Sequence, residues 1–326
     1  MNVAILGATG AVGRTMLAVL AERAFPIEQL TLLASARSAG MRIPWGGRDH
    51  EVRVPEAGSF HGVDVALFSA GATRSEEWAP RAAAEGAVVV DNSSAWRMDP
   101  EVPLVVPEVN GRALARRPRG IIANPNCSTI QMAVALGPLH AAAGLRRVVA
   151  TTYQSVSGAG EGGREALRRE LRGEAAEDSP FARRIAGNVI PQIGDFDAAG
   201  WTGEERKMRD ETRKILDLPS LPVVATCVRV PVDIGHAVQV AVETERPLEQ
   251  AEAVAVLESA PGIQVAAGPE DFPAPHQAAG RDEVFVGRIR VDPDFPGVLH
   301  LWVVADNLRK GAATNAVQIA EMLFPG

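Results

Sequence analysis

The sequence predicts an α/β protein in which a Rossmann-like, doubly wound domain is followed by an α+β domain with a mostly antiparallel sheet. The first third alternates apolar runs with helical patterns, beginning with a strand at 3–6 and a helix at 11–24. Such alternation is typical of a parallel sheet covered by helices. A glycine-rich turn at 7–13 joins these two elements, as in dinucleotide-binding domains. After residue 127, long stretches with two-residue alternation appear, such as 146–155, and this period indicates a half-buried antiparallel sheet.

The remaining elements follow from the same two periodicities. In the first domain we expect a helix at 75–85 and strands at 30–34, 63–69, 87–90 and 120–123. In the second domain we expect strands at 146–155, 223–230, 237–244, 283–291 and 299–305, with helices at 163–172, 204–216 and 248–259. Two segments rich in Gly, Ala, Pro and charge, 173–180 and 268–282, are expected to be loops.

The domain organisation follows from chain length and from the last helical pattern. A chain of 326 residues is too long for one ordinary core, so two domains are expected. Residues 311–323 read as a helix, which we expect to pack back on the first domain. The first domain is therefore predicted to be discontinuous, formed by 1–127 and 308–326, and the second domain is predicted to span 128–307.

The composition excludes several classes of function. Hydrophobic content of 46% and charged content of 22% are typical of a soluble globular protein. The net charge of −7 argues against a basic surface for nucleic acid or anionic lipid. The chain opens with a strand rather than a signal segment, and no apolar stretch reaches the ~20 residues of a membrane span. The two cysteines are far apart and the six histidines are scattered, so we expect a cytoplasmic protein without disulfides or a metal site.

Cys127 is the strongest candidate for a catalytic residue. It follows a predicted strand and a turn that contains proline, and it directly precedes a helical pattern at 130–136. The N–H groups of a first helical turn carry partial positive charge and stabilise a thiolate, the reactive form of cysteine. The alternative is a small buried cysteine. The other cysteine, Cys227, lies in an apolar strand and is expected to be structural.

A dinucleotide site is predicted at the turn between the first strand and the first helix. Its glycines, spaced GxxGxxG, let the turn close and let a phosphate approach the backbone at a helix N-terminus. The alternative is a plain tight turn. The expected contacts are Gly7, Thr9, Gly10, Ala11, Val12 and Gly13.

The second strand is followed by Ser35, Arg37 and Ser38, where NAD enzymes commonly carry an acidic residue for the ribose 2′-hydroxyl. A guanidinium with two hydroxyls suits a 2′-phosphate instead. NADP is therefore expected in preference to NAD, the alternative being that Arg37 is a solvated loop charge. The short-chain dehydrogenases and the sugar epimerases have the same GxxGxxG turn. Those enzymes resemble one another in a catalytic Tyr-x-x-x-Lys pair as well. Here position 153 is Tyr and position 157 is Ser, so that class is nearly excluded.

The order and spacing of several motifs resemble the aspartate-β-semialdehyde dehydrogenase family over nearly the whole chain. Besides the glycine-rich turn, they are the segments 91–97, 106–110, 124–129, 153–160, 204–208, 229–232 and 307–313, together with His236. The resemblance implies reduction of L-aspartyl-β-phosphate by NADPH to the semialdehyde and phosphate. That step feeds the synthesis of lysine (through diaminopimelate), threonine, methionine and isoleucine.

The resemblance also implies a mechanism through a cysteine thioester. An acyl phosphate is a poor direct hydride acceptor, and a thiolate overcomes this by displacing phosphate. Cys127 is the implied nucleophile, His236 the implied acid–base residue, and Gln154 the residue that orients the carbonyl and the nucleophile. Asn126 is expected to help stabilise the oxyanion. Without the resemblance, His236 reads equally well as a surface histidine after a turn.

The implied substrate carries an ammonium group, a carboxylate and a phosphate. Arg229 is expected to bind the carboxylate through two hydrogen bonds. Glu204 is expected to hold the ammonium group. Lys207 lies on the same helix face as Glu204 and is expected to reach the phosphate, together with Arg97. Spacing alone would favour an ordinary exposed helix pair for Glu204 and Lys207.

The nicotinamide and the partner subunit complete what the resemblance implies. Ser157 and Gly158 are expected to bring backbone close to the nicotinamide, because glycine leaves room. Asn307 resembles the family's contact to the nicotinamide amide, although a turn asparagine is the alternative. A homodimer or homotetramer is implied, with the second domain serving catalysis and dimerisation.

Some residues depart from the family pattern or carry weaker expectations. Arg206 stands where an apolar residue is usual, and Ala72 stands where a second glycine is common. Asn110 and Glu205 are weaker candidates for substrate contacts.

Two alternatives remain open at this stage. N-acetylglutamyl-phosphate reductase resembles this chain in fold and chemistry, but its nucleophile motif is normally Pro-Gly-Cys followed by an aromatic residue, unlike Asn126-Cys127-Ser128. A non-catalytic NADP-binding paralogue would be expected to lack the nucleophile, which is present here.

Overall fold

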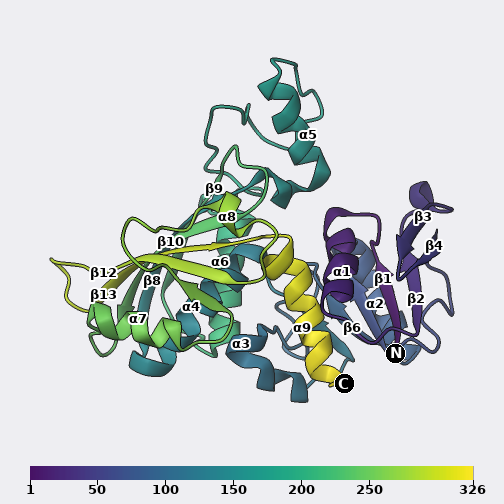
Figure 1. The fold of residues 1–326 in the computed structure, drawn as a ribbon, viewed down its shortest axis with the longest axis horizontal. Coiled ribbons are helices and arrows are strands. Elements are labelled where there is room, and N and C mark those ends of the chain that lie inside the picture. The colour runs from purple at the N-terminus through teal and green to yellow at the C-terminus, as the bar shows by residue number, and fades with distance from the viewer. Residues whose placement is uncertain (326) are drawn as a thin grey trace. The chain divides into compact units, whose positions relative to one another are not determined.

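The computed structural model describes residues 1–325, which form two compact units (Figure 1). The first unit contains Met1–Asn126 and the segment that begins at Ala312, and the second unit contains Cys127–Gly311. The chain therefore passes between the units immediately before Cys127 and again after Gly311. Within residues 1–325, no helix combines the length and apolar character that a membrane span requires.

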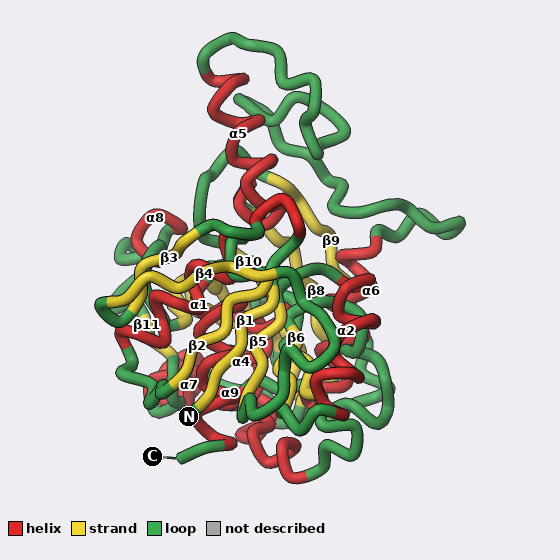
Figure 2. Tube along the Cα trace, turned by 90° about the vertical axis from the view of Figure 1, so that its right-hand side faces the viewer, coloured by secondary structure: helices red, strands yellow, loops and turns green. Residues whose placement is uncertain are grey.

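The first unit is built on a seven-stranded sheet. Its order is β3 (Arg42–Trp45), β4 (Arg48–Arg53), β2 (Gln29–Leu33), β1 (Asn2–Leu6), β5 (Val65–Phe68), β6 (Val88–Asp91) and β7 (Ile121–Ala123). Every neighbouring pair is parallel except β3 and β4, which are antiparallel. Figure 2 shows β2, β1, β5 and β6 side by side, as in a doubly wound domain.

Helices from both ends of the chain share the core of this unit. Helix α1 (Ala11–Glu22) packs against α9 (Thr314–Leu323), which follows a short π-helix at Arg309–Ala313. Val317 and Ile319 of α9 lie in the same buried cluster as the side chains of β1 and β5. Helix α2 (Ala72–Ala84) packs on β6, and α3 (Pro107–Asn110) is a single turn beside α9.

The hairpin formed by β3 and β4 was not predicted from the sequence. Its strands are short and mostly exposed, so they lack the apolar run that marks the buried strands. The turn between them is formed by Gly46 and Gly47, which have positive φ angles of 57° and 74°. Glycine permits this conformation, which suits a two-residue hairpin turn.

The second unit has a six-stranded sheet. Its order is β11 (Ile263–Val265), β12 (Val284–Val291), β13 (Val298–Ala305), β10 (His236–Thr244), β8 (Leu145–Gln154) and β9 (Val223–Arg229). The three inner pairs are antiparallel, and the outer pairs β11–β12 and β8–β9 are parallel. The predicted fold class is therefore confirmed: a doubly wound first domain and a mostly antiparallel second sheet.

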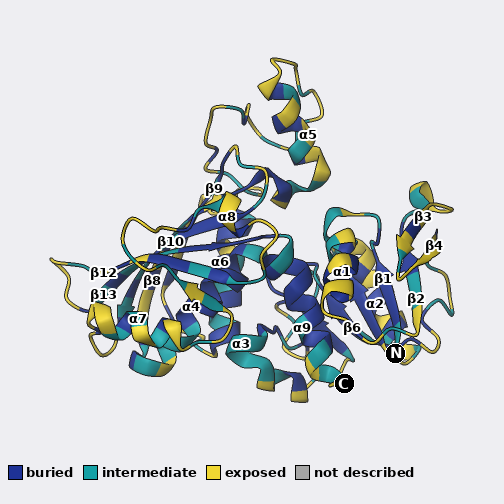
Figure 3. Cartoon of the chain, viewed as in Figure 1, coloured by how far each residue is buried: buried dark blue, intermediate teal, exposed yellow. Residues whose placement is uncertain are grey.

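Helices cover one face of this second sheet. Helix α4 (Cys127–Ala143) packs against the sheet and against α6 (Gly203–Leu216) and α7 (Gln250–Glu258). The unit also contains α5 (Gly160–Leu171) and the single turn α8 (Pro275–Ala278). Strand β10 is buried along most of its length (Figure 3). In β8, Gln154 is buried whereas the preceding Tyr153 is exposed, because successive side chains of a strand point to opposite faces.

Candidate active site

Cys127 is the first residue of α4, so it lies at the N-terminus of a helix as the sequence predicted. It is only partly buried, whereas the following residues 128–136 are buried. A Cβ atom on Gly311 would lie 3.0 Å from Cys127 Cβ, so glycine is needed there for the close approach of the backbone. The thiol is thus accessible and lies at the positive end of a helix, where the thiolate is stabilised.

Arg229 supplies a buried positive charge in the same unit. It lies at the end of β9 with an exposed fraction of 5%. Its Nη1 donates a 2.6 Å hydrogen bond to the carbonyl oxygen of Ser155. Burial lowers the pKa of Arg229, while the neighbouring Glu204, Cys127 and Cys227 raise it. The guanidinium is therefore electrostatically coupled to these groups, and it remains charged because free arginine titrates far above neutral pH.

Glu204 and Lys207 form an ion pair on the first turns of α6. Lys207 Nζ lies 3.2 Å from Glu204 Oε2, and the Glu204 side chain is only 7% exposed against 40% for Lys207. Gln154 Nε2 donates a 3.2 Å hydrogen bond to the other oxygen of Glu204. The predicted shared helix face is confirmed. The buried carboxylate distinguishes this pair from an ordinary exposed one.

Glu205 and Asn110, the weaker candidates for substrate contacts, both form hydrogen bonds within the protein, and the substrate contacts themselves stay predictions. Glu205 accepts hydrogen bonds from the backbone N–H groups of Thr202, at 2.8 Å, and Cys227, at 3.2 Å. With Thr202 it forms the capping box that begins α6. Asn110 Oδ1 accepts from the N–H of Val106 at 2.9 Å.

Three further residues that the sequence analysis singled out are Cys227, expected to be structural, and Arg206 and Ala72, which depart from the family pattern. Cys227 is fully buried, and burial raises the pKa of its thiol, in keeping with the structural role predicted for it. Arg206 is exposed and pairs with Asp197. Ala72 is the first residue of α2.

His236 begins β10 and is fully buried. Its Nδ1 accepts a 3.0 Å hydrogen bond from the backbone N–H of Ser155, whose Oγ also lies 3.0 Å from Nδ1. Burial, and then the positive charge of Arg229, lower the pKa of His236 to about 3. A Cβ atom on Gly158 would lie 3.2 Å from His236 Nε2 and 2.7 Å from Arg229 Nη1. The absence of a side chain at position 158 therefore leaves space beside both groups.

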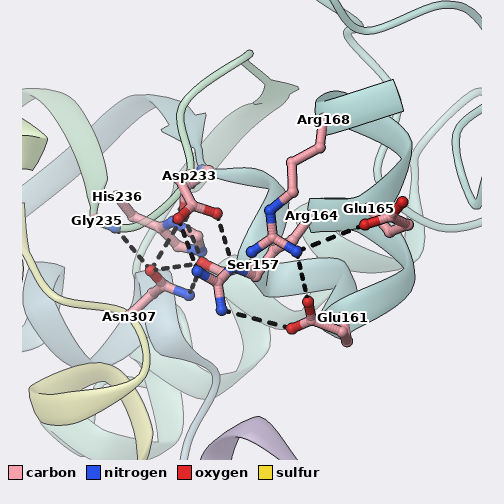
Figure 4. Close-up of polar contacts among 10 residues, drawn as sticks. Ser157, Glu161, Arg164, Glu165, Arg168, Asp233, Gly235, His236 and Asn307 are labelled. Carbon is pink, nitrogen blue, oxygen red and sulfur yellow. Dashed lines mark hydrogen bonds and ion pairs between the residues drawn. The ribbon is translucent and has the colours of Figure 1, made fainter. Parts of the chain in front are cut away.

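Asn307 connects the loop that ends at Gly235 to the segment after β8 (Figure 4). Its Oδ1 accepts from the N–H of Gly235 at 2.9 Å, and its Nδ2 donates to Ser157 Oγ at 3.0 Å. Asp233 of the same loop forms a two-point ion pair with Arg164, at 2.7 and 2.8 Å (Figure 4). Because an amide nitrogen carries two hydrogens, the nicotinamide contact predicted for Asn307 remains open to it and stays a prediction.

The glycine-rich turn of the first unit has the geometry of a phosphate cradle. Gly7 has a φ of 94°, and a Cβ atom on it would lie 2.2 Å from the carbonyl oxygen of Ser69. A Cβ atom on Gly13 would lie 2.2 Å from the carbonyl oxygen of Gly7. Gly10 precedes α1 and is exposed, and within residues 1–325 no side chain caps this helix. The turn therefore fits a dinucleotide pyrophosphate on the N–H groups of Thr9, Ala11 and Val12.

Replacing Gly13 with alanine is expected to weaken NADPH binding at least about tenfold and to lower the free energy of unfolding by about 1–3 kcal/mol, because the new methyl group overlaps backbone. Titration calorimetry with NADPH and thermal unfolding measure the two effects. Gly162→Ala is the matched control, because a Cβ atom there meets open space. Wild-type NADPH affinity in the Gly13 variant would contradict the assignment of this turn.

The segment after β2 lies beside the glycine-rich turn in the first unit. Ser38 Oγ lies 3.1 Å from Thr9 Oγ1, which links the two segments. Arg37, in a short 3-10 helix at Ala36–Ser38, is exposed, and Ser35 precedes it. Residues 34–40 contain no acidic side chain.

Two predicted substrate residues lie in the first unit. Arg97 is 7% exposed and donates hydrogen bonds to the carbonyl oxygens of Asn124, at 3.0 Å, and Asn92, at 2.9 Å. It is therefore not a solvated loop charge. Asn126 is also 7% exposed. The second unit contains the other predicted catalytic and substrate residues, which are Cys127, Gln154, Glu204, Lys207, Arg229 and His236.

Ser155 is the site residue that sequence reasoning missed. Both of its backbone groups are used, the N–H by His236 and the carbonyl by Arg229. Any residue except proline supplies the same N–H, so the side-chain pattern contains no signal for this role. Its position directly after the predicted catalytic Gln154 was the one available hint.

Comparisons with known families define the class of this fold and site. Residues 2–117 match the semialdehyde dehydrogenase NAD binding domain, and residues 136–310 match the semialdehyde dehydrogenase dimerisation domain. The chain that contains the glycine-rich turn and Cys127 is thus an oxidoreductase of the semialdehyde dehydrogenase class.

Individual relatives narrow this class. Aspartate-semialdehyde dehydrogenase of Aquifex aeolicus is 53% identical over 99% of this chain and 97% of its own length. A crystal structure of aspartate semialdehyde dehydrogenase II from Vibrio cholerae, complexed with ASA, matches with a TM-score of 0.96 at 52% identity, over 99% of this chain and 97% of that one. Aspartate semialdehyde dehydrogenase with NADP from Candida albicans matches with a TM-score of 0.78 at 27% identity, over 99% and 98% of the two chains. This chain belongs to the aspartate-semialdehyde dehydrogenase family, as the motif resemblance predicted.

Proposed function

We propose that this chain reduces L-aspartyl-β-phosphate to L-aspartate β-semialdehyde and phosphate with NADPH, through a thioester on Cys127. The observation that carries the proposal is an accessible cysteine at the N-terminus of α4, electrostatically coupled to the buried Arg229, in a chain of this family. Bound nicotinamide would supply the hydride, which the protein side chains cannot. The reaction serves the synthesis of lysine, threonine, methionine and isoleucine.

The buried charges of the second unit support the substrate assignments. The Arg229 guanidinium binds the substrate carboxylate in the proposal, because its planar fork offers two parallel hydrogen bonds. The buried Glu204 carboxylate receives the ammonium group, and Gln154, bonded to Glu204, orients the carbonyl. Lys207 is the partly exposed cation for the phosphate. Arg97 and Asn126 of the first unit are proposed to contact the phosphate and the oxyanion.

The cofactor preference, the oligomer and the location are finer parts of the proposal. Arg37, Ser35 and Ser38 support NADP over NAD, and the Candida albicans relative was solved with NADP. The turn that contains Gly7, Gly10 and Gly13 is proposed to bind the pyrophosphate of the cofactor. The residues proposed to lie beside the nicotinamide are Ser157, Gly158 and Asn307. The match to a dimerisation domain supports a homodimer or homotetramer. Neither Cys127 nor Cys227 is part of a disulfide, in keeping with the cytoplasmic location that we propose.

The test of the proposed function is the reverse reaction, the phosphate-dependent oxidation of L-aspartate β-semialdehyde, followed by NADPH absorbance. Absorbance is expected to rise only when semialdehyde, phosphate and NADP are all present. N-acetylglutamate semialdehyde serves as the control substrate, and faster oxidation of it would refute the proposal in favour of the sister reductase. Turnover without phosphate would refute the acyl-phosphate chemistry.

Replacing Arg37 with glutamine is expected to raise the KM for NADP by about 10-fold to 100-fold, because one charge-assisted hydrogen bond of about 1.5–3 kcal/mol is lost. The KM for NAD is expected to stay within about twofold. Steady-state kinetics with each cofactor measure both values. Arg48→Gln, on the exposed strand β4, is the control. Equal changes for NADP and NAD would assign Arg37 to a general role rather than to the 2′-phosphate.

A further inference from the structure

Helix α5 begins directly after the segment that we propose to lie beside the nicotinamide. Ser157 and Gly158 belong to a short 3-10 helix at Val156–Ala159, and α5 starts at the next residue, Gly160. The conformation of this segment therefore depends on the contacts that hold it at each end.

Glycine lets the segment pack closely but gives it little stiffness of its own. Four of the seven residues 157–163 are glycine. Gly160 has a φ of 76°, and a Cβ atom on Gly163 would lie 2.5 Å from the carbonyl oxygen of Val156. Glycine has more backbone freedom than any other residue and disfavours a helix, and within residues 1–325 no side chain caps the start of α5. The segment is therefore expected to need contacts from elsewhere in the fold.

The loop between β9 and β10 supplies such contacts through its backbone. The N–H of Val156 donates to the carbonyl oxygen of Val232 at 2.8 Å. The N–H of Ser157 donates to the carbonyl oxygen of Asp233 at 3.2 Å. The position of Ser157 is thus tied to that of Asp233.

The carboxylate of Asp233 forms a two-point ion pair with Arg164 of α5 (Figure 4). Arg164 Nε and Nη2 donate to its two oxygens at 2.7 and 2.8 Å, the geometry in which a guanidinium fits a carboxylate best. These hydrogen bonds lower the pKa of Asp233, so the carboxylate is ionised at neutral pH. Asp233 therefore holds both ends of residues 157–164, binding Ser157 through its backbone and Arg164 through its side chain.

The other ion pairs of α5 do not reach this loop. Within residues 1–325, Arg168, Arg169 and Arg172 pair with glutamates of the helix itself or of the turn directly after it. Leu167 lies in a buried cluster with Val156, so α5 keeps an apolar contact when its charges are removed. Loss of the pair between Arg164 and Asp233 is therefore expected to loosen the segment without unfolding the protein.

We propose that Arg164 and Asp233 are positioning residues, whose ion pair holds Ser157 and Gly158 in the conformation that receives the nicotinamide end of the cofactor. Neither Arg164 nor Asp233 is proposed to touch the substrate or the cofactor. The proposal rests on the proposed function, since it concerns the cofactor of the same reaction. Removing the pair weakens the binding of the nicotinamide half of NADPH and leaves the binding of the adenine half unchanged.

Two ligands separate the halves of the cofactor, because 2′,5′-ADP carries the adenine, a ribose and the 2′-phosphate but no nicotinamide. Arg164→Gln is expected to weaken NADPH binding about 3-fold to 10-fold, the upper range for a partly exposed ion pair, because the geometry is bidentate. Its affinity for 2′,5′-ADP is expected to change less than about twofold. Titration calorimetry without substrate measures both affinities. Equal weakening of both ligands, or unchanged NADPH binding, would overturn the proposal.

A double-mutant cycle shows whether the effect belongs to the pair. Asp233→Asn is expected to match Arg164→Gln, and the double variant to lose no more affinity for NADPH than either single variant. Fully additive losses would contradict the proposal. Arg172→Gln is the matched control, because Arg172 binds Glu174 at two points, 2.6 and 3.1 Å, without contacting the loop. Its NADPH affinity is expected to stay within about twofold of wild type, and a loss equal to that of the Arg164 variant would assign the effect to the helix instead.

Hydrogen–deuterium exchange tests the segment without any ligand. The backbone amides of 155–160 are expected to exchange at least about threefold faster in Arg164→Gln than in wild type or in Arg172→Gln. Unchanged exchange, with thermal unfolding showing that the variant is folded, would refute the positioning role. The binding and exchange measurements need no turnover. The proposed function fails separately, if the wild type does not oxidise L-aspartate β-semialdehyde.

Discussion

Replacing Cys127 with alanine is expected to lower kcat by about 10⁴-fold or more, because none of the other predicted site residues can form the thioester. NADPH binding is expected to remain, since the glycine-rich turn belongs to the first unit. Turnover is measured by NADPH absorbance, and binding by titration calorimetry. Mass spectrometry of acid-quenched wild-type reactions is expected to find the acyl adduct on the peptide that contains Cys127.

The matched control is Cys227→Ala, which removes the other thiol of the chain. That thiol is buried and its pKa is raised, so it is protonated at neutral pH. We expect lower stability, by about 1 kcal/mol for the small cavity, but wild-type kcat. Turnover in the Cys127 variant, or an adduct found on the Cys227 peptide, would contradict the assignment of the nucleophile.

Replacing Arg229 with leucine is expected to lower kcat/KM by about 10²–10³-fold, corresponding to about 3–4 kcal/mol for truncating one partner of a buried charge pair. Two losses combine in this result. The substrate carboxylate loses its two-pronged partner, and the carbonyl oxygen of Ser155 loses the guanidinium that holds it. Arg229→Lys is expected to recover only part of the loss, since a single ammonium cannot reproduce the planar fork.

Arg209→Leu is the matched control for that substitution. Arg209 lies on α6 and forms an ion pair with its neighbour Asp210. It is not one of the residues proposed to contact the substrate. Steady-state kinetics with varied aspartate semialdehyde at saturating NADP measure the effect. An unchanged KM and kcat in the Arg229 variant would remove this residue from substrate binding.

The fold was predictable wherever burial determines the sequence pattern. The strand at Val65–Phe68 is buried at every position, so its apolar run was sufficient to predict it. In β8 the alternation of buried Gln154 with exposed Tyr153 gave the two-residue period. The hairpin at Arg42–Trp45 and Arg48–Arg53 escaped prediction because exposed strands can tolerate polar side chains on both faces.

The site was predictable in its side chains and not in its backbone contacts. Cys127 and Glu204 could be found because motif order and helix position mark them. The burial of Glu204 could not, since spacing alone describes an exposed pair equally well. The hydrogen bond to His236 Nδ1 comes from the N–H of Ser155, a group that almost every residue has. It forms only when β8, which ends directly before Ser155, is in register with β10.

The neutral imidazole of His236 also has a consequence for the behaviour of the protein in acid. An unfolded chain protonates this ring below its ordinary pKa of 6.5, whereas the folded chain does not until about 3. The contribution to stability is therefore complete above pH 6.5 and is lost as the pH falls towards 3, at up to about 1.4 kcal/mol per pH unit. At low pH the ring should therefore become protonated when the protein unfolds rather than in the folded state. The lowest pH at which the enzyme stays folded is thus set in part by this buried imidazole.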